Sequence, residues 1–443
     1  MVNRLLVHGG TVVPMTAEGV SFAGGVLVED GRIAAAEPDL AAPPGVERLD
    51  ASGALVLPGF VQAHVHVVQS LARGRADGLE LLPWLLERIL PYEATLGAAD
   101  VAAAARLGIA ELLTGGTTAA LDMGTVHYQD EVFEAAAGLG IRLASGKCHI
   151  DFGDGVPAPL LEDTAASLAA AEALGRRWHG GANGRLRYAV APRFALTCSR
   201  ELLEGSARLA RANGWLLHTH ASENREETRR VRELFGKANV AYLAEVGCAG
   251  ADTVLAHCVH LEDGEFDLLA RQGTAVAHCP GANLKLASGI ADLPRLLGLG
   301  VRVGLGADGP PCNNRLSVFH EMALAGTLHN LAHGPAAVSA WRVLELATWR
   351  GAEAIGLGGQ VGRLAPGWRA DLVVVDAGAF AMTPAGDPAA MLVYGGGAAA
   401  VRHVVVDGRT VVRDGALVTG DGPAIRGAAQ AAGQRIAERL GWT

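Results

Sequence analysis

Residues 215–309 contain four short apolar runs, WLLHTHAS (215–222), TVLAHC (253–258), TAVAHCPG (274–281) and VRVGLGADG (301–309). Each run is long enough for one strand, and each reaches a polar residue at or near its end. The segments between them, such as TRRVRELFGKANVAYLAEVG (228–247) and EFDLLARQG (265–273), have the spacing of helices. Apolar strands that alternate with helices are typical of a parallel sheet with both faces buried. This stretch therefore predicts an α/β fold.

The same alternation extends toward the N-terminus. Four earlier runs have the same character: GFVQAHVHV (59–67), TTAALDM (117–123), IRLASGKCHI (141–150) and RLRYAVAP (185–192). The total is eight strands, each but the last followed directly by a helical pattern of about 10–15 residues. The last strand meets a helix that begins near Arg315. Eight such units indicate a (β/α)8 TIM barrel, which we place at residues 59–364.

The two ends of the chain have a different pattern. Residues 1–58 alternate apolar and polar positions in short bursts, with DG and GG at the turns, and residues 365–417 repeat that style. Such a pattern is typical of a meander of short strands. Because each piece is too short to fold alone, we expect residues 1–58 and 365–443 to form one small composite β-sandwich. The last stretch, AIRGAAQAAGQRIAERLGW (424–442), has helical spacing, and we expect it to pack on the outside.

Composition excludes several classes of protein. The 37 basic and 46 acidic residues give a net charge of −9, and no Lys/Arg-rich run occurs, which argues against nucleic-acid binding. No run of about twenty apolar residues predicts a membrane span, and the first residues, MVNRLLVHGGTVVPM, do not resemble a signal peptide. The six cysteines are scattered without a CxxC pair, so we expect no disulfide framework and a cytoplasmic location.

Histidines gather at the ends of the predicted barrel strands, where barrel enzymes carry their active sites. The strand ends carry these polar residues: His64 and His66, His218 and His220, His257 and His260, His278, and Asp308. A single histidine at a strand end is usually a hydrogen-bonded core residue. Several histidines and an aspartate at the same end of one barrel instead indicate a site.

The spacing within strands indicates which of these residues could bind a metal. Residues i and i+2 of a strand point the same way, so His64 and His66 can both face the barrel axis. His220 and Asp308 can converge on them from other strands. Three nitrogens and one oxygen suit Zn²⁺ or Fe²⁺ and leave a position open for water. His218 shares the face of His220, and we expect it to support the ligands rather than bind the metal.

A metal-bound water needs its proton removed, and a leaving group needs a proton supplied. Glu223 follows His220 at the end of its strand, and His257 could reach the same water. Neither the HxE and PCxxC pair of base-editing deaminases nor the HExxH of zincins occurs. A two-metal barrel would call for a bridging lysine. The fourth strand has none and Lys147 on the third is a weak candidate, so we expect one metal.

Several long motifs resemble the amidohydrolase superfamily, in its branch of single-metal deaminases and chlorohydrolases. The matching segments are PGFVQAHVH (58–66), LARGRADGLELLPWLLERILPYE (71–93), PRFALTCS (192–199), HTHASENREE (218–227), AHCVHL (256–261), AHCPGANLKLASG (277–289), GLGADGPPCNNRLSVFHEM (304–322) and GRLAPGWRADLVVVD (362–376). The resemblance runs through nearly the whole chain. It implies a metal-bearing barrel with a β-sandwich built from both termini, and usually a homo-oligomer.

The resemblance also implies roles for individual residues. One divalent metal, most often Zn²⁺ and alternatively Fe²⁺, would be held by His64, His66, His220 and Asp308. Glu223 would move a proton to a ring nitrogen of the substrate, while His257 and Asp308 activate the water. For substrate binding, Glu93 matches a residue that binds ribose hydroxyls in adenosine-type members, and Trp84 would line the pocket.

Within this branch the segments ADGLELLPWL (76–85) and GDGVPAPLLEDT (153–164) are most similar to deaminases of 5′-deoxyadenosine, methylthioadenosine and S-adenosylhomocysteine. The expected reaction is hydrolytic deamination that gives the inosine analogue and ammonia. Arg193 departs from that group and resembles guanine deaminase, where it binds the purine carbonyl. Guanine deamination, or hydrolysis of an s-triazine or another amino- or chloro-heterocycle, is therefore the alternative. A non-catalytic scaffold would have lost a ligand or the acid, and this chain has lost neither.

Overall fold

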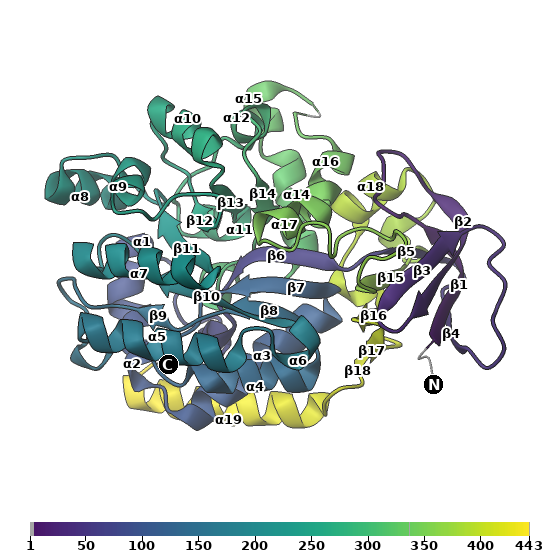
Figure 1. Cartoon of the computed structure of the whole chain (residues 1–443), viewed down its shortest axis with the longest axis horizontal. Helices are drawn as coiled ribbons and strands as arrows, with labels where there is room; N and C mark the ends of the chain where they lie inside the picture. The colour runs from purple at the N-terminus through teal and green to yellow at the C-terminus, as the bar shows by residue number, and fades with distance from the viewer. Residues whose placement is uncertain (1–3, 336, 443) are drawn as a thin grey trace.

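The computed structural model, which describes residues 4–335 and 337–442, contains a barrel and a separate sheet (Figure 1). Eight strands, each parallel to its neighbours, form the barrel in the order β14-β13-β12-β11-β10-β8-β7-β6. Their bounds are β6 (Phe60–Val65), β7 (Thr117–Asp122), β8 (Arg142–Ser145), β10 (Leu186–Pro192), β11 (Leu216–Ala221), β12 (Thr253–His257), β13 (Ala275–His278) and β14 (Val303–Leu305). A parallel bridge between Val65 and Asp308 brings the first and last strands together. The predicted (β/α)8 barrel is confirmed.

Helices follow the barrel strands and cover the outside of the barrel. The longer ones are α3 (Ala98–Thr114), α4 (Gln129–Leu139), α5 (Thr164–Trp178), α7 (Arg200–Asn213), α8 (Arg225–Phe235), α10 (Asp263–Gln272) and α14 (Val318–Thr327). Shorter helices are η1 (Val67–Ala72), α1 (Leu81–Trp84), η2 (Leu85–Ile89), α2 (Leu90–Thr95), η3 (Ala158–Leu160), α6 (Gly181–Gly184), α9 (Asn239–Glu245), α11 (Pro280–Lys285), α12 (Leu293–Gly298), α13 (Pro310–Asn313), α15 (Asn330–His333), α16 (Ala340–Leu346) and α17 (Trp349–Ala354). Local chemistry sets their ends: the Ser199 hydroxyl accepts a hydrogen bond from the Leu202 N–H at the start of α7, and Gly214, at φ 65°, ends it.

The third predicted strand is broken in two. Residues 142–145 form β8 and residues 148–149 form a separate strand, β9 (Cys148–His149), and both pair with β10. The break lies at Gly146, where an added Cβ would lie 1.8 Å from the carbonyl oxygen of Ala189. Only glycine permits this close approach of two backbones, so the chain leaves the sheet there and returns two residues later.

The chain ends form one continuous nine-stranded sheet in the order β18-β17-β16-β15-β5-β1-β2-β3, with β4 paired to β1. Its strands are β1 (Arg4–Val12), β2 (Phe22–Glu29), β3 (Arg32–Glu37), β4 (Glu47–Asp50), β5 (Ala54–Pro58), β15 (Leu372–Asp376), β16 (Val401–Val406), β17 (Arg409–Arg413) and β18 (Ala416–Leu417). The short helices η4 (Phe380–Met382), α18 (Pro388–Ala390), η5 (Met391–Gly395) and η6 (Ala398–Ala400) connect β15 to β16. The predicted meander holds for β1 to β3 and for β15 to β18, where each strand pairs antiparallel with the next, but not for β4 and β5, which both pair with β1 in parallel. We propose residues 1–58 and 365–443 as one domain and 59–364 as the other.

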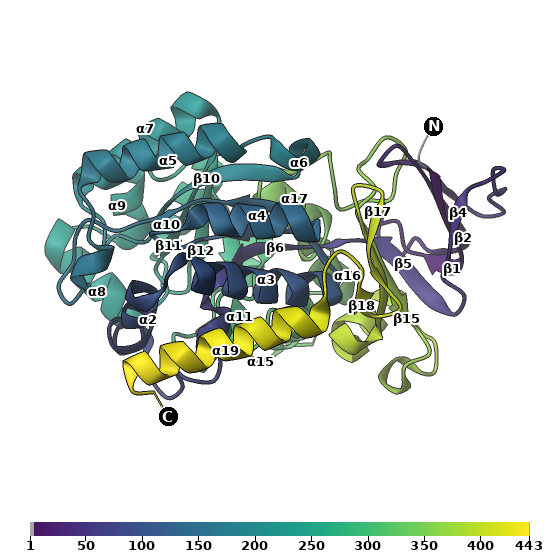
Figure 2. The ribbon, with the colours of Figure 1, turned by 90° about the horizontal axis from the view of Figure 1, so that it is seen from below.

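The last helix, α19 (Gly422–Leu440), runs back along the barrel (Figure 2). It packs against α3, α2 and η1, and its Arg435 and Arg439 lie 3.1 and 3.5 Å from the carboxylate of Asp100 on α3. The chain therefore returns from the terminal sheet to the barrel before it ends. Among the described residues, no helix is long and apolar enough to cross a membrane.

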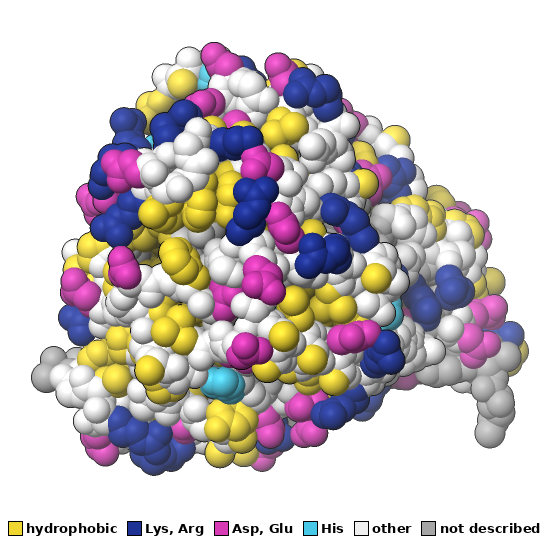
Figure 3. Space-filling model, turned by 60° about the vertical axis from the view of Figure 1, so that its left-hand side comes forward, with side chains coloured by type: hydrophobic (Ala, Val, Ile, Leu, Met, Phe, Trp, Pro, Cys, Tyr) yellow, Lys and Arg dark blue, Asp and Glu magenta, His cyan; other side chains and the backbone are white. Residues whose placement is uncertain are grey.

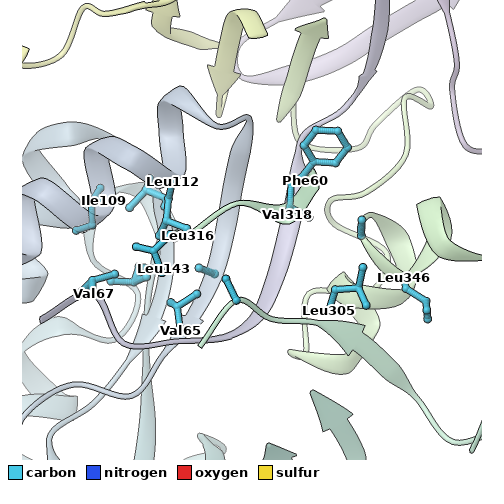
Figure 4. Close-up of a cluster of buried hydrophobic side chains, with 14 of the residues drawn as sticks. Phe60, Val65, Val67, Ile109, Leu112, Leu143, Leu305, Leu316, Val318 and Leu346 are labelled. Carbon is cyan, nitrogen blue, oxygen red and sulfur yellow. The ribbon is translucent and has the colours of Figure 1, made fainter. Parts of the chain in front are cut away.

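Buried side chains join the strands to the surrounding helices and the barrel to the terminal sheet. Figure 4 shows part of the core, with Phe60 and Val65 of β6 among helix residues such as Ile109. Phe60 also meets Phe319 edge to face, at 5.1 Å between ring centroids. Beyond this apolar core, the buried guanidinium of Arg142 on β8 donates two hydrogen bonds, of 2.9 and 3.0 Å, to the carboxylate of Asp371 next to β15. A bidentate pair of this kind fixes the orientation of the two units.

Candidate active site

Five side chains converge at the carboxyl ends of the barrel strands. The nearest ligand atoms of His64, His220, His257 and Asp308 all lie within 4.8 Å of one another. The Nε2 atom of His66 lies 3.2 Å from Nε2 of His220 and 3.4 Å from a carboxylate oxygen of Asp308. The four residues that sequence analysis selected as metal ligands therefore lie together, and His257 lies against them.

The backbone at the strand ends turns two of these side chains inward. His257 and Asp308 have φ values of 74° and 61°, in the left-handed region that residues with side chains rarely adopt. Such conformations persist where the surrounding structure over-determines them, and they concentrate at functional sites. At the end of β6, by contrast, the i, i+2 spacing brings His64, within the strand, and His66, one residue beyond it, together with their ring centroids 4.8 Å apart.

Hydrogen bonds at Nδ1 orient each imidazole of the cluster. Nδ1 of His66 lies 2.9 Å from the carbonyl oxygen of Met123, and Nδ1 of His220 lies 2.7 Å from that of Arg193. Nδ1 of His64 lies 2.9 Å from Nε2 of His218, and Nδ1 of His257 lies 2.8 Å from Oδ1 of Asn283. This is the outward hydrogen bonding that metal-binding histidines make. His218 supports His64, as expected.

These partners fix the protonation of the rings. A carbonyl oxygen only accepts hydrogen bonds, so Nδ1 of His66 and of His220 carries the proton and Nε2 is left with its lone pair. The two lone pairs face each other at 3.2 Å, which is unfavourable unless a cation lies between them. Within the described part of the chain, the buried Nε2 atom of His64 has no hydrogen-bond partner either. This donor set fits a divalent metal ion.

The protonation equilibria agree with that donor set. Burial lowers the pKa of His66 to about 3, and burial also lowers the pKa of His64 and His220, so all three rings are neutral near pH 7. Burial alone would raise the pKa of Asp308, but the close contact with the His64 ring, whose Nε2 atom lies 3.2 Å from Oδ1, holds that pKa well below its usual range. Neutral imidazoles and an ionised carboxylate are the forms that bind metal.

Glu223 lies beside this cluster with a carboxyl group that favours its protonated form. One of its oxygens lies 3.4 Å from Nε2 of His257, and the other has no hydrogen-bond partner among the described residues. Burial raises the pKa of Glu223 well above its usual value, and the negative charges of Asp308 and Glu227 raise it further. A protonated carboxyl group in this position can supply a proton to a bound molecule.

A pocket opens over the cluster, and both polar and apolar side chains line it. The polar residues are His66, Arg193, His220, Glu223, Glu227 and Asp308, and the apolar residues are Leu81, Trp84, Leu85 and Phe194. Three of the apolar residues, Trp84 among them, belong to α1 and η2, in the insertion that follows β6. On the face of the molecule that Figure 3 shows, acidic and basic side chains are interspersed with apolar patches.

The two other predicted substrate-binding residues contact each other. Nη1 of Arg193 lies 2.7 Å from one carboxylate oxygen of Glu93, and Nη2 lies 3.3 Å from the other. Gln69 donates a further hydrogen bond of 3.1 Å to the same carboxylate. Glu93 is 5% exposed and Arg193 is 3% exposed. The guanidinium of Arg193 therefore pairs with Glu93, and its carbonyl oxygen accepts a hydrogen bond from the ring of His220.

Sequence reasoning missed several residues of this site. Asn283 and Glu227 lie in segments that carried the family resemblance, but nothing in those segments assigned them a contact. A signal for Glu227 existed, because Asn224 and Glu227 have the N-x-x-E spacing of a helix capping box. Lys147, the weak candidate for a second metal, forms an ion pair with Glu162 and hydrogen-bonds Ser167. Its ammonium group is thus engaged elsewhere.

Comparison with known proteins identifies the family of the chain. The model of the amidohydrolase family matches residues 55–411. The chain belongs to the amidohydrolase family. It is 38% identical to a 5-methylthioadenosine/S-adenosylhomocysteine deaminase of Symbiobacterium thermophilum, over 92% of this chain and 93% of the relative. It is 39% identical to a 5'-deoxyadenosine deaminase of Methanothermobacter thermautotrophicus, over 88% of this chain and 89% of that relative.

A solved structure agrees with this assignment. The crystal structure of an adenosine deaminase from Xanthomonas campestris with bound zinc has a TM-score of 0.92 to this chain. The two sequences are 31% identical, and the match covers 98% of each chain. Both the barrel and the terminal sheet are therefore features that this amidohydrolase shares with a zinc-containing relative.

Proposed function

We propose that this amidohydrolase is a metal-dependent deaminase of 5′-modified adenosines, such as 5′-deoxyadenosine, methylthioadenosine and S-adenosylhomocysteine. The products would be the inosine analogue and ammonia. The observation that carries the proposal is the buried Glu223 carboxyl group, 3.4 Å from His257, beside a cluster of imidazoles and Asp308. The names of relatives that match about nine-tenths of the chain support the substrate class.

We propose His64, His66, His220 and Asp308 as the ligands of one divalent metal ion. The lone pairs of the histidines and the carboxylate of Asp308 form a set suited to Zn²⁺, with Fe²⁺ as the alternative. Zinc is favoured because the related deaminase from Xanthomonas campestris binds it. When bound, such an ion supplies Lewis acidity and lowers the pKa of a coordinated water molecule.

The residues around the ligands would carry the protons. Glu223 donates the proton of its carboxyl group to the ring nitrogen next to C6 of the purine as water adds to that carbon. Asp308, whose second oxygen lies 3.9 Å from Nε2 of His257, accepts a proton from the water with the help of His257. Asp308 then passes that proton to the amino group, and the C6–N bond breaks to release ammonia. As the C6 carbonyl forms, the added hydroxyl group gives its proton to the Glu223 carboxylate. Water and the aminopurine thus become the oxopurine and ammonia, and Glu223 is protonated again.

Other residues would hold the substrate. Trp84 and its apolar neighbours would cover the purine, and the Glu93 carboxylate would accept hydrogen bonds from the ribose hydroxyls. The alternative, guanine deamination, requires Arg193 to bind a purine carbonyl. The contact of 2.7 Å between Arg193 and Glu93 favours adenosine analogues, because a guanidinium that already pairs with a carboxylate is better placed to orient it than to bind a base.

The test is ammonia release from a panel of 5′-deoxyadenosine, methylthioadenosine, S-adenosylhomocysteine, guanine, cytosine and an s-triazine. We expect the adenosine analogues to be the best substrates by a wide margin. An enzyme that is fast on guanine and silent on every 5′-modified adenosine would overturn the substrate assignment. A homo-oligomeric assembly and a cytoplasmic location are further proposals, and sedimentation of the purified protein tests the first.

A further inference from the structure

Glu227 is a buried carboxylate in the pocket wall that the proposed reaction does not use. It lies in the first turn of α8 and is 0% exposed. One of its oxygens accepts hydrogen bonds from the backbone N–H of Glu223, at 2.7 Å, and of Asn224, at 3.2 Å. The other accepts from the side-chain amide of Asn239, at 2.6 Å. Its hydrogen-bond donors are thus all uncharged, which is an unusual environment for a fully buried carboxylate.

The backbone around Glu223 is held from two sides. Ser222, at φ 53°, directs its carbonyl oxygen to the N–H groups of Val259 and His260, at 2.9 and 2.8 Å. On the other side, Glu227 holds the N–H of Glu223 itself. The side chain of Glu223, in contrast, is held loosely within the described part of the chain: one oxygen has no hydrogen-bond partner and the other lies 3.4 Å from Nε2 of His257, while Ser288 lowers the pKa of the group. The position of its backbone therefore limits where its carboxyl group can lie.

We propose that Glu227 is a positioning residue that fixes the backbone of Glu223 so that its carboxyl group faces His257 and the substrate. The inference rests on the proposed function, in which Glu223 carries the proton. A shift of a reacting group by about 1 Å can slow a reaction about a hundredfold. Glu227 acts through Glu223 and need not touch the substrate.

The chain offers a matched control for the loss of a helix cap. Glu265 has the same place in the first turn of α10, is 3% exposed and accepts from the N–H of Glu262, at 2.9 Å, and of Val240, at 2.7 Å. It is thus a second buried capping-box glutamate, but it holds no residue that we place in the reaction. Replacing Glu227 or Glu265 with alanine should lower thermal stability alike.

The conservative variant Glu227→Gln keeps an oxygen that can accept from the N–H of Glu223. Its new NH₂ group can donate a hydrogen bond to the amide oxygen of Asn239. That oxygen has no partner among the described residues and can turn toward residue 227 when the Asn239 amide rotates. We expect Glu227→Gln to keep kcat within about fivefold of wild type. Glu227→Ala should lower kcat by about 10- to 100-fold, with KM and metal content unchanged. Glu265→Ala should keep the wild-type kcat.

Steady-state kinetics with 5′-deoxyadenosine, elemental analysis and crystal structures of the variants test the inference. Equal kcat in Glu227→Ala and Glu265→Ala would overturn it, and so would a loss in Glu227→Gln as large as in Glu227→Ala, since the charge would then matter rather than the hydrogen bond. If Glu227→Ala does not fold, Glu227→Asp replaces it as the test variant, because the shorter side chain moves the carboxylate oxygen away from the N–H of Glu223. An unchanged kcat in Glu227→Asp would then overturn the inference.

A crystal structure separates this inference from the proposed function. In Glu227→Ala, or in Glu227→Asp, the Glu223 carboxyl group should move away from His257, whereas in Glu265→Ala it should stay in place. If the wild-type protein deaminates none of the adenosine analogues, the proposed function fails. The position of the Glu223 carboxyl group then still decides the inference: a displaced group supports it and an unmoved group overturns it.

Discussion

Replacing Arg193 with methionine should destabilise the protein, because it leaves the carboxylate of Glu93 buried without its cation. Glu93 is 5% exposed, and after the change the side-chain donor left to it among the described residues is Gln69, at 3.1 Å. Removal of one partner from a buried ion pair costs about 3–5 kcal/mol. We therefore expect the free energy of unfolding of Arg193→Met to fall by about that amount at pH 7.

The double variant Glu93→Gln/Arg193→Met removes both charges, so no buried charge is left unpaired. It should be more stable than Arg193→Met, and the coupling energy of the cycle should reach about 0.5–3 kcal/mol. Urea unfolding of the four metal-saturated proteins, followed by circular dichroism, measures each free energy. A loss below about 1 kcal/mol in Arg193→Met, or strict additivity in the double variant, would refute the reasoning.

The same variants test the role of the pair in the reaction. The carbonyl oxygen of residue 193, which holds the ring of His220, survives the substitution, so metal content should be kept. Misplacement of Glu93 should lower kcat/KM for 5′-deoxyadenosine by about ten- to a hundredfold, the loss expected for a hydrogen bond to a charged group. Retention of the wild-type kcat/KM in both Arg193→Met and Glu93→Gln would show that the pair does not touch the substrate.

Glu223→Gln should keep its metal and lose about 10²–10⁴-fold in kcat, since it removes the proton donor and no ligand; more than a tenth of wild-type kcat would contradict that role. His66→Ala and Asp308→Ala should each lose metal and activity together, and full occupancy by elemental analysis would disprove the ligand assignment. Burial raises the pKa of Glu321 to about 7, so the folded protein keeps a proton that the unfolded chain releases between about pH 4.5 and 7. The wild-type protein therefore loses stability as pH rises through that window. Between pH 5 and 8, the free energy of unfolding of Glu321→Gln should rise relative to that of wild type by up to about 3 kcal/mol. A difference between the two proteins that does not vary with pH in urea unfolding would count against this prediction.

The parts of the site that sequence could predict are those set by local periodicity. The i, i+2 spacing of His64 and His66 places both on one face of a strand, and the alternation of strands and helices fixes which strand ends meet. Local periodicity does not predict the pairing of Glu93 with Arg193. It joins the insertion after β6 to the end of β10, and no spacing along the chain encodes such a contact.

Backbone contacts between distant segments explain the errors in the fold. The break in the third strand depends on how closely Gly146 approaches Ala189, and the parallel pairing of β4 and β5 with β1 depends on which edges are free once the chain folds. Turn residues predict where a strand ends but not which strand it joins. The predicted meander was therefore right for β1 to β3 and for β15 to β18, where each strand pairs with the next, and wrong for β4 and β5.

The composite sheet constrains the order in which the protein can be made. Pro58 at the end of β5 pairs with Leu372 of β15. The centre of the sheet therefore joins two strands that are separated in the sequence by the entire barrel. During synthesis the first five strands emerge early, and the edge of β5 stays open until β15 has left the ribosome. An unpaired edge is prone to association with other chains. Nascent chains stalled before residue 372 should therefore depend on chaperones more than the released protein does.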